Sequence, residues 1–409
     1  MKKIITIVIV IAIISSVIIS NQQKNETKLN INTEKVQAKI TEYYIYGTKL
    51  NLKGQIPITE YKDIKLLLYN EQEQVKEIKL ITKKEEDYVT FSIEEEINNG
   101  LYLDNISRGT YYFFLEIIND DIKYYSLSND TTYDHINYYT LSKYNNYISV
   151  DFNNKHKTLM LNITENKKEE VYDITIDAGH GGKDSGAVGN GYYEKNIALD
   201  VALDLQKELT RRGLKVAITR TTDIMLEEYN IEKDIGRAVI AQQNNSKYLF
   251  SIHLNSHNQK GMNGVEILTP PNIDYTFARN LAQNIVEKTK TSYSNNLGFK
   301  MYNGVYTRII NQAEIDSRNE SNENPYDIKL GTSYYYMLRE PGGYMTGAYV
   351  DGRDKEVGEN PYYDSNKGVE SYIIELGYII NKKDITNITK NQKLYVIAIA
   401  DTIIDKLIK

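Results

Sequence analysis

The chain contains no cysteine among its 409 residues. Without thiols it can form neither disulfides nor thiolate metal sites, and it cannot carry a lipid anchor on cysteine. A metal ion would therefore have to be bound by histidine, aspartate or glutamate. Histidine itself is scarce, and its five positions are His135, His156, His180, His253 and His257. The search for a metal site is thus limited to a small part of the chain.

Tryptophan is also absent, and neither sign of charge forms a long block. The 49 basic and 55 acidic side chains give a net charge of −6. This balance does not produce the basic surface that nucleic-acid binding requires, so no nucleic-acid partner is expected. In place of tryptophan the chain has 36 tyrosines, whose polar tips supply contact surface that can also form hydrogen bonds.

One long hydrophobic run stands at the N-terminus, where two lysines precede an apolar stretch from Ile4 to Ile19. Residues 1–20 are therefore interpreted as a secretory signal peptide or a signal anchor. Because no A-x-A cleavage site follows, an uncleaved membrane anchor is favoured over a cleaved signal. Either way the lysines stay in the cytoplasm, and the rest of the chain is extracytoplasmic, membrane-anchored or secreted to the cell wall.

Two regions follow the hydrophobic segment. Residues 21–39 are polar and lack apolar periodicity, which predicts a linker. Between residues 40 and 165 apolar and polar side chains alternate with a period of two, as in half-buried strands. The segments 111–117 and 122–128 flank turn-forming residues and predict a hairpin, and 43–52 is interpreted as one strand. Many short strands without a long helix predict a small all-β, sandwich-like domain.

After a charged joint at 165–170, strand and helix patterns alternate through residues 171–409. Apolar strands are predicted at 172–178, 214–220, 247–254, 264–268 and 369–379, and helices at 194–212, 231–243, 274–290 and 392–408. This alternation predicts an α/β domain with a mostly parallel sheet and helices on both faces. The stretch 310–368, rich in Asn, Tyr, Gly and Asp, breaks the pattern and is interpreted as a long insertion.

A cluster of glycines around a histidine, "TIDAGHGGKDSG" at 175–186, follows the first strand of this domain. His180 lies just beyond that strand, and His253 lies near the end of the third. Because the carboxyl ends of parallel strands share one edge, both imidazoles can face one cleft. Glu194 begins the next helix and can return its carboxylate to the same cleft. Two histidines and a carboxylate with an open fourth position form the ligand set of a catalytic zinc site.

The spacing of these residues in the sequence does not by itself exclude alternatives to this ligand set. His257 is a rival ligand, although its segment is strand followed by loop, so helical stacking does not bring it to His253. A lone histidine beside a strand is more often structural, and Glu194 alone fits a first-turn acid favoured by the helix dipole. Asp177 or Asp184 could orient an imidazole from outside the ligand set.

Glu375 is a carboxylate inside an otherwise apolar strand, "YIIELGYI". An uncompensated buried carboxylate is costly, so its position requires a reason. A metal site needs a base that takes a proton from water, and Glu375 is the candidate for this general base and for the acid that protonates the leaving amine. A salt-bridged core residue is the structural alternative.

At these residues the chain resembles the zinc-dependent N-acetylmuramoyl-L-alanine amidases, a family of bacterial cell-wall hydrolases. The resemblance covers about 171–408 and is carried by three blocks in family order, at 174–223, 237–256 and 372–384. It implies a phosphorylase/hydrolase-like α/β fold, zinc bound by His180, Glu194 and His253, and Glu375 as the catalytic glutamate. It also implies that a metal-activated water cleaves the amide between N-acetylmuramic acid and L-alanine in peptidoglycan.

The chain also departs from the family pattern. The insertion at 310–368 shows little helical periodicity, which argues against a helix that blocks the zinc and favours a cleft-wall loop whose tyrosines contact glycan or peptide. Arg220 and Arg237 stand at family-like positions without an assigned role beyond structure. An inactive amidase-like protein that only binds peptidoglycan or a partner is the alternative function, and the sequence does not identify a protein activator.

Overall fold

The computed structural model describes residues 31, 33–70, 72, 75–129, 138–141, 146–153, 156–166, 170–226, 236–237, 240–259, 261–320, 330–342 and 367–408. The segment 1–20, most of the linker, His135, most of the helix expected at 231–243 and residues 343–366 of the insertion lie outside these ranges. Among the helices of the described part, none is both long and apolar enough to cross a membrane.

The N-terminal part, called the β-domain below (residues 33–166), is built from strands. These are β1 (Ala38–Tyr46), β2 (Lys49–Ile56), β3 (Asp63–Asn70), β4 (Val75–Lys79), β5 (Ile81–Lys84), β6 (Val89–Ser92), β7 (Leu101–Tyr102), β8 (Gly109–Ile118), β9 (Ile122–Asn129), β10 (Tyr138–Leu141), β11 (Asn146–Asn153) and β12 (Thr158–Glu165), with a short 3-10 helix at Leu103–Asn105.

The β-rich character and the hairpin of β8 and β9 are confirmed. The single strand expected at 43–52 is wrong, because Gly47 adopts a positive φ of 60° and the chain turns there between β1 and β2. The strands also do not form two separate sheets of a sandwich. The start of β1 pairs in parallel with β9, which joins all strands into one continuous, barrel-like sheet. Alternation predicts strands but carries no information about such long-range pairing.

The C-terminal part, called the α/β domain below (residues 170–408), contains the expected alternation. Its elements are β13 (Ile174–Ala178), β14 (Val188–Gly189), β15 (Tyr192–Tyr193), α2 (Glu194–Arg211), β16 (Val216–Ile218), α3 (Ile240–Gln243), β17 (Tyr248–Asn255), β18 (Glu266–Leu268), α4 (Thr276–Thr289), β19 (Lys300–Tyr302), β20 (Val305–Tyr306), α5 (Gln312–Glu320), α6 (Tyr336–Arg339), β21 (Lys367–Gly368), β22 (Glu370–Tyr378) and α7 (Lys382–Ile408). Helix α7 begins ten residues before the expected closing helix and kinks at Asn391.

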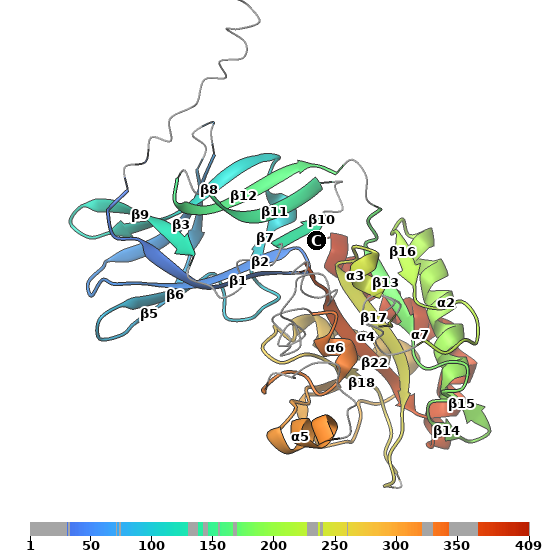
Figure 1. Ribbon diagram of the computed structural model, residues 1–409. Coiled ribbons are helices and arrows are strands. Elements are labelled where there is room, and N and C mark those ends of the chain that lie inside the picture. The colour runs from blue at the N-terminus through green and yellow to red at the C-terminus, as the bar shows by residue number, and fades with distance from the viewer. Residues whose placement is uncertain are drawn as a thin grey trace, which may run out of the picture.

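The main sheet of this domain runs in the order β16-β13-β17-β22-β18-β20-β19. Strands β16, β13, β17 and β22 are mutually parallel, and only β18 against β22 and β19 against β20 are antiparallel. The mostly parallel sheet is therefore confirmed. Helices α2, α4 and α7 pack together on one face (Figure 1), where side chains such as Ile176, Phe250 and Ile374 form the main core.

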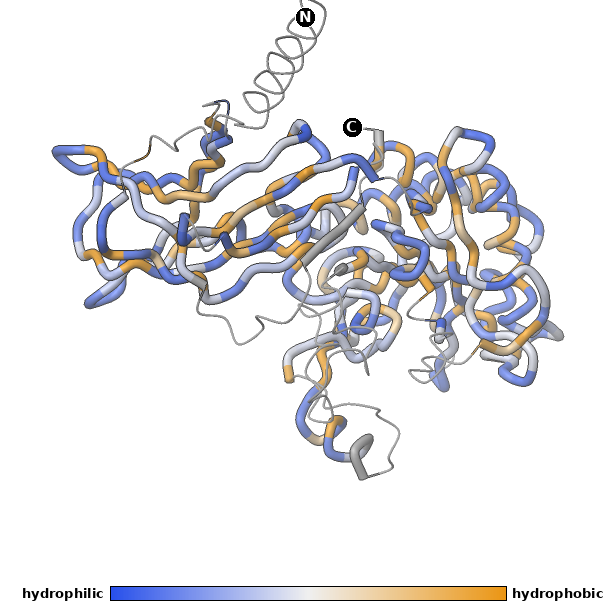
Figure 2. The backbone as a smooth tube through the Cα atoms, turned by 45° about the horizontal axis from the view of Figure 1, so that its top comes forward, coloured by the Kyte–Doolittle hydropathy of each residue, from blue (hydrophilic) through white to orange (hydrophobic). Residues whose placement is uncertain are grey.

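The other face has a smaller core. Leu249 of β17 and Ile373 of β22 contact α3 and α6 there, through Ala241, Met337 and Leu338. Helices thus cover both faces, as expected, but unequally. Hydrophobic stretches follow the inner strands and helices of both domains, whereas hydrophilic stretches lie at their turns and ends (Figure 2).

The two domains are joined directly. Strand β21 pairs in parallel with β1 of the β-domain, and the Gly47 N–H donates to the Gly368 carbonyl at 2.5 Å. Beside this pairing, Lys49 of the β-domain forms an ion pair with the buried Glu370 at 3.2 Å. Glu370 begins β22, the strand that also carries Glu375, so the β-domain is attached to a strand of the candidate site.

Candidate functional site

The strands of the α/β domain alternate between apolar and polar side chains near their carboxyl ends. On β17, Phe250 and Ile252 enter the main core, while Ser251 and His253 point to the opposite face. On β22, Glu375 is the register partner of His253 and shares its face. The same face of β13 carries Asp177. The fold therefore gathers one polar stripe over three neighbouring strands, at the edge where parallel strands end.

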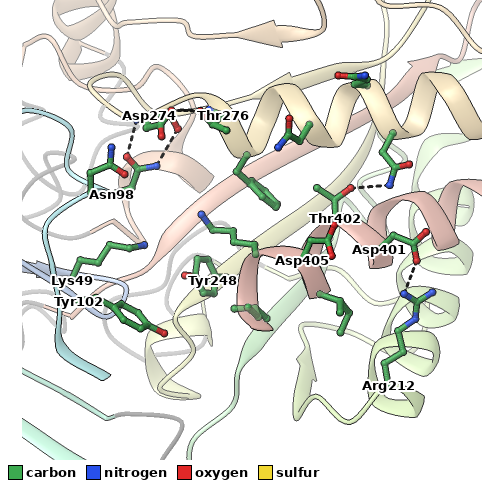
Figure 3. A pocket seen from close by; sticks show the side chains of 18 of the residues that line it. Lys49, Asn98, Tyr102, Arg212, Tyr248, Asp274, Thr276, Asp401, Thr402 and Asp405 are labelled. Carbon is green, nitrogen blue, oxygen red and sulfur yellow. Dashed lines mark hydrogen bonds and ion pairs between the residues drawn. The ribbon is translucent and has the colours of Figure 1, made fainter. Parts of the chain in front are cut away.

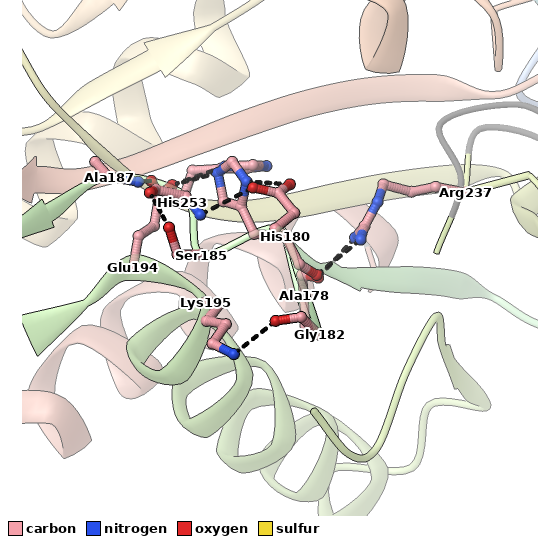
Figure 4. Close-up of polar contacts among 12 residues, drawn as sticks. Ala178, His180, Gly182, Ser185, Ala187, Glu194, Lys195, Arg237 and His253 are labelled. Carbon is pink, nitrogen blue, oxygen red and sulfur yellow. Dashed lines mark hydrogen bonds and ion pairs between the residues drawn. The ribbon is translucent and has the colours of Figure 1, made fainter. Parts of the chain in front are cut away.

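The loop after β13 is held by two arginines whose guanidinium groups donate to backbone carbonyls. Arg220 donates to the carbonyls of Ala178, at 2.9 Å, and Gly179, at 2.8 Å. Arg237 donates to the carbonyl of Ala178 at 2.6 Å and to that of His180 at 2.8 Å (Figure 4). These contacts fix the position of His180, which has a positive φ of 59°. The two arginines that lacked a role in the sequence thus shape the loop.

Glu194 is the first residue of α2 and is buried, with an exposed fraction of 3%. Its Oε2 accepts a hydrogen bond from the Ala187 N–H at 2.8 Å, and its Oε1 accepts one from the Leu254 N–H at 2.9 Å. The carboxylate is therefore oriented by backbone groups of two different segments. The dipole of α2 further favours a negative charge at this end of the helix.

The imidazoles of His180 and His253 converge on this carboxylate. His180 Nε2 lies 3.0 Å from Glu194 Oε1, and His253 Nδ1 lies 2.9 Å from the same oxygen. The two rings meet edge to face with centroids 4.8 Å apart. One ligand atom from each of the three residues lies within 4.8 Å of the other two. Two imidazole nitrogens and a carboxylate oxygen at this spacing fit a divalent metal ion.

Two glycines make this convergence possible. A Cβ atom at Gly179 would lie 2.4 Å from His253 Cε1, and one at Gly186 would lie 2.6 Å from His180 Cδ2 and 2.7 Å from Glu194 Oε2. Gly186 also has a φ of +60°, where side chains are strained. The glycines of the opening loop therefore leave room for the ligand side chains.

The electrostatics keep the carboxylate ionised. Burial alone would raise the pKa of Glu194, but hydrogen bonds and charge from His180 and His253 outweigh it and hold the pKa far below its ordinary value. Burial would lower the pKa of His180, yet Glu194 and then Asp184 raise it overall. Protons therefore compete with a metal for this imidazole, and metal affinity is expected to fall as the pH is lowered.

Glu375 lies beside the cluster on the adjacent strand. It is partly buried, and its Oε2 is enclosed without a hydrogen-bond partner among the described residues. Burial raises its pKa well above the ordinary value, and the charges of Glu194 and Glu266 raise it further. Its other register neighbour, Glu266 of β18, accepts hydrogen bonds from Ser294 at 2.6 Å and Asn255 at 2.8 Å. Sequence reasoning missed Glu266. Its position between two apolar residues in the predicted strand "GVEIL" could have indicated a polar side chain on the face of the site.

Two aspartates were proposed to orient an imidazole, and only one of them contacts an imidazole in the structure. Asp184 Oδ2 lies 2.7 Å from His180 Nδ1. Asp177 instead pairs with Arg237 at 2.6 Å and accepts hydrogen bonds from Ser251 and Thr219. His257 is exposed and does not belong to the His180–Glu194–His253 cluster. The rival ligand is therefore not brought to the site.

A cavity of about 270 Å³, called the metal-site cleft below, opens beside these residues. One wall comes from the insertion, where Tyr335, Tyr336 and Met337 line it at the start of α6. The side chain of Tyr335 is enclosed, and its pKa is raised to about 12, first by burial and then by the charge of Glu375. The described part of the insertion thus borders the cleft.

Asp184→Asn is expected to weaken metal binding by about 10- to 100-fold, as is typical when a partner of a ligating histidine is removed. Asp184 accepts from the Gly186 N–H at 2.9 Å through Oδ1 while Oδ2 contacts His180. An asparagine has only one oxygen and cannot replace both acceptors. Competition with a chromophoric chelator measures the affinity. Lys183→Gln, an exposed change in the same loop, is the control, and equal affinities of both variants would contradict the expected role.

Comparisons with known proteins match part of this chain. A family model described as N-acetylmuramoyl-L-alanine amidase matches residues 174–405. The N-acetylmuramoyl-L-alanine amidase LytC of Bacillus subtilis is 31% identical over 125 residues, which cover 31% of this chain and 23% of LytC. A putative N-acetylmuramoyl-L-alanine amidase of Buchnera aphidicola subsp. Baizongia pistaciae is 38% identical over 106 residues, or 25% of this chain and 46% of the relative. The chain thus spans less than half of the length of these relatives.

Solved structures are also similar to part of this chain. The catalytic domain of CwlV, an N-acetylmuramoyl-L-alanine amidase from Bacillus (Paenibacillus) polymyxa var. colistinus, is 23% identical, with a TM-score of 0.38 over 58% of this chain and 98% of that one. The amidase AmiC2 of Nostoc punctiforme is 22% identical, with a TM-score of 0.39 over 59% of this chain and 100% of the other.

Proposed function

Because this chain belongs to the N-acetylmuramoyl-L-alanine amidase family of cell-wall hydrolases, we propose that it hydrolyses the amide between N-acetylmuramic acid and L-alanine in peptidoglycan. The observation that carries the proposal is the convergence of His180, Glu194 and His253 next to the unpartnered carboxylate oxygen of Glu375. The reaction takes place outside the cytoplasm, where the N-terminal hydrophobic run directs the chain.

The three converging side chains are the proposed zinc ligands. A zinc ion bound there supplies Lewis-acid polarisation of the scissile carbonyl and lowers the pKa of a water molecule. The protein holds the ligands in place: backbone N–H groups orient Glu194, and Asp184 holds the ring of His180. This set of hydrogen bonds fixes ring orientation before any metal binds.

Glu375 is the proposed proton carrier. Glu375 lines the metal-site cleft, so its carboxylate can accept a proton from a water molecule there. Burial, and then the charges of Glu194 and Glu266, raise the pKa of Glu375, which makes its carboxylate a stronger base for this step; a cation bound by the three ligands would oppose this rise. The protonated Glu375 then donates to the nitrogen of the leaving L-alanine amine.

The insertion provides one wall of the substrate site in this proposal. Tyr335 and Tyr336 supply aromatic surface with hydroxyl tips, and Met337 adds a flexible apolar contact. Such a wall suits a substrate that has both sugar and peptide parts. The described residues of the insertion leave about 270 Å³ of the metal-site cleft open.

Digestion of purified peptidoglycan tests the proposed activity. The zinc-loaded full-length protein is expected to release peptides with a free L-alanine amino terminus, detected by mass spectrometry, and to lose this activity with a chelator until zinc is restored. A zinc-loaded protein that binds the polymer without releasing peptides would contradict the proposal and favour the alternative of a non-cleaving binding protein. The complete set of ligands and base argues against that alternative.

A further inference from the structure

A second, larger cavity of about 980 Å³ lies between the two domains and is called the interdomain groove below. Asn98, Tyr102 and Asn105 line it from the β-domain, and helix α4 and the end of α7 line it from the α/β domain (Figure 3). Lys49 and Lys406 approach each other at its base, next to Tyr248.

This groove is separate from the metal-site cleft. Lys49 and Lys406 both bind Glu370 at the start of β22, five residues before Glu375. At about 3.3 Å per residue this corresponds to roughly 17 Å along the strand. The groove also lies on the sheet face that α4 and α7 cover, whereas Glu375 points to the opposite face. It therefore requires its own explanation.

The walls of the groove are tied to each other. The Asn98 side chain donates to the Asp274 carbonyl at 3.1 Å, and the Asp274 N–H donates back to Asn98 Oδ1 at 2.7 Å. The Ile97 N–H donates to the Asn272 carbonyl at 3.0 Å, and Lys49 pairs with Glu370. Together with the pairing of β1 and β21, these contacts make the groove a preformed site at a domain interface, a usual place for ligand binding.

The lining favours an uncharged ligand that forms many hydrogen bonds. It contains three basic residues and four acidic ones, which leaves a formal charge of −1. Six side-chain amides accompany them: Asn98, Asn99, Asn105, Asn280, Gln283 and Asn284. Of these, Asn98, Gln283 and Asn284 already donate hydrogen bonds within the protein. A polyanion would meet no basic excess here, whereas the hydroxyl and acetamido groups of an N-acetylated sugar would meet matching donors and acceptors.

Two amides on opposite walls are available to such a ligand. Asn105 of the β-domain and Asn280 of α4 are exposed, and neither side chain has a hydrogen-bond partner among the described residues. Asn280, Gln283, Asn284 and Glu287 follow one another at helical spacing along α4, so they form a continuous polar stripe along the groove.

We propose that the interdomain groove binds the N-acetylated sugar backbone of peptidoglycan, as a second attachment point apart from the metal-site cleft. The choice of this polymer among uncharged saccharides rests on the proposed function. Attachment at two sites would raise the effective concentration of the glycan at the catalytic cleft without strengthening either contact.

Calorimetric titration with the hexamer of N-acetylglucosamine tests this site. The probe has no lactyl amide, so it cannot be hydrolysed by an amidase. The full-length Glu375→Gln protein, kept in mild detergent because of its apolar N-terminus, is expected to bind the hexamer. Asn105→Ala/Asn280→Ala in the same background should weaken binding at least fivefold, and Asn280→Trp, which fills the groove, should abolish it. Asn196→Ala, an exposed asparagine on α2 outside the groove, should bind like the parent.

The outcomes distinguish a failure of the groove proposal from a failure of the proposed amidase activity. Absence of hexamer binding, equal binding by the double variant, or displacement of the hexamer by free stem peptide would overturn the groove proposal and leave the amidase proposal standing. Retained, groove-dependent binding by a wild type that releases no peptides would support the groove and contradict the amidase activity. Unchanged thermal unfolding of the variants shows that lost binding does not arise from lost folding.

Discussion

The Glu375→Gln variant is expected to lose about 10²- to 10⁴-fold in turnover while it binds as much zinc as the wild type. The amide keeps the size of the side chain but cannot accept and return a proton. The free Oε2 of Glu375 makes no structural hydrogen bond within the described chain, so the substitution removes chemistry without removing a contact. Rates of peptide release and metal content by mass spectrometry are measured on the same samples.

A second glutamate provides the control for this experiment. Glu86 is exposed in the turn between β5 and β6, and Glu86→Gln should change neither quantity. Turnover of Glu375→Gln within a few-fold of wild type would remove Glu375 from the mechanism. Loss of zinc together with loss of turnover would instead assign Glu375 to metal binding.

The Glu370→Gln variant is expected to be less stable than wild type by about 3–5 kcal/mol, the usual cost of breaking a buried ion pair from one side. Glu370 is fully buried and contacts Lys49 at 3.2 Å, Lys406 at 2.7 Å and the Tyr372 hydroxyl at 2.6 Å. Without the carboxylate, two partly buried ammonium groups remain without a counter-charge. Burial lowers the pKa of Lys406, so the loss of its partner carboxylate removes the main favourable charge beside this ammonium.

The pH dependence of this difference follows from the pKa of Glu370. Burial alone would raise the pKa, but the charges of Lys406 and Lys49 outweigh it and hold it to about 2, against an ordinary value of 4.5. A lowered pKa stabilises the folded state above pH 4.5, and this contribution is lost as the pH falls toward 2. The stability gap between wild type and Glu370→Gln should therefore be constant from pH 5 to 8 and smaller at pH 3.

Urea unfolding followed by circular dichroism measures this gap. The matched control is Glu77→Gln, because Glu77 forms an exposed ion pair with Lys65 at 3.0 Å and its loss should cost less than about 1 kcal/mol. A Glu370→Gln variant as stable as this control would contradict the assigned role.

The alternation of side chains along the strands explains how much of the candidate site could be predicted from the sequence. The alternation of β13, β17 and β22 places Asp177, Ser251, His253 and Glu375 on one face, and all three strands were expected from apolar runs alone. His253 and Glu375 were already placed in one site from the sequence, and a period of two in the next strand would also have drawn attention to Glu266, the register partner of Glu375 on β18.

Other parts of the site carry no signal in the sequence. Asp184 and Asp177 lie at similar distances along the chain from His180, yet only Asp184 contacts its ring, because Arg237 and Ser251 hold Asp177 elsewhere. The same holds for Tyr335, the residue before α6, which is 155 residues from His180 and lines the cleft because α6 packs against β22.

By itself, the sequence of this chain determined the α/β alternation, the family and the small set of side chains able to bind a metal, because periodicity and residue chemistry are local properties. Only the tertiary structure decided which oxygens and nitrogens meet, how β9 joins β1, and that Lys49 reaches Glu370 across 321 positions. Such contacts depend on which surfaces bury one another. That choice is a free-energy balance over the whole chain, and no short segment contains it.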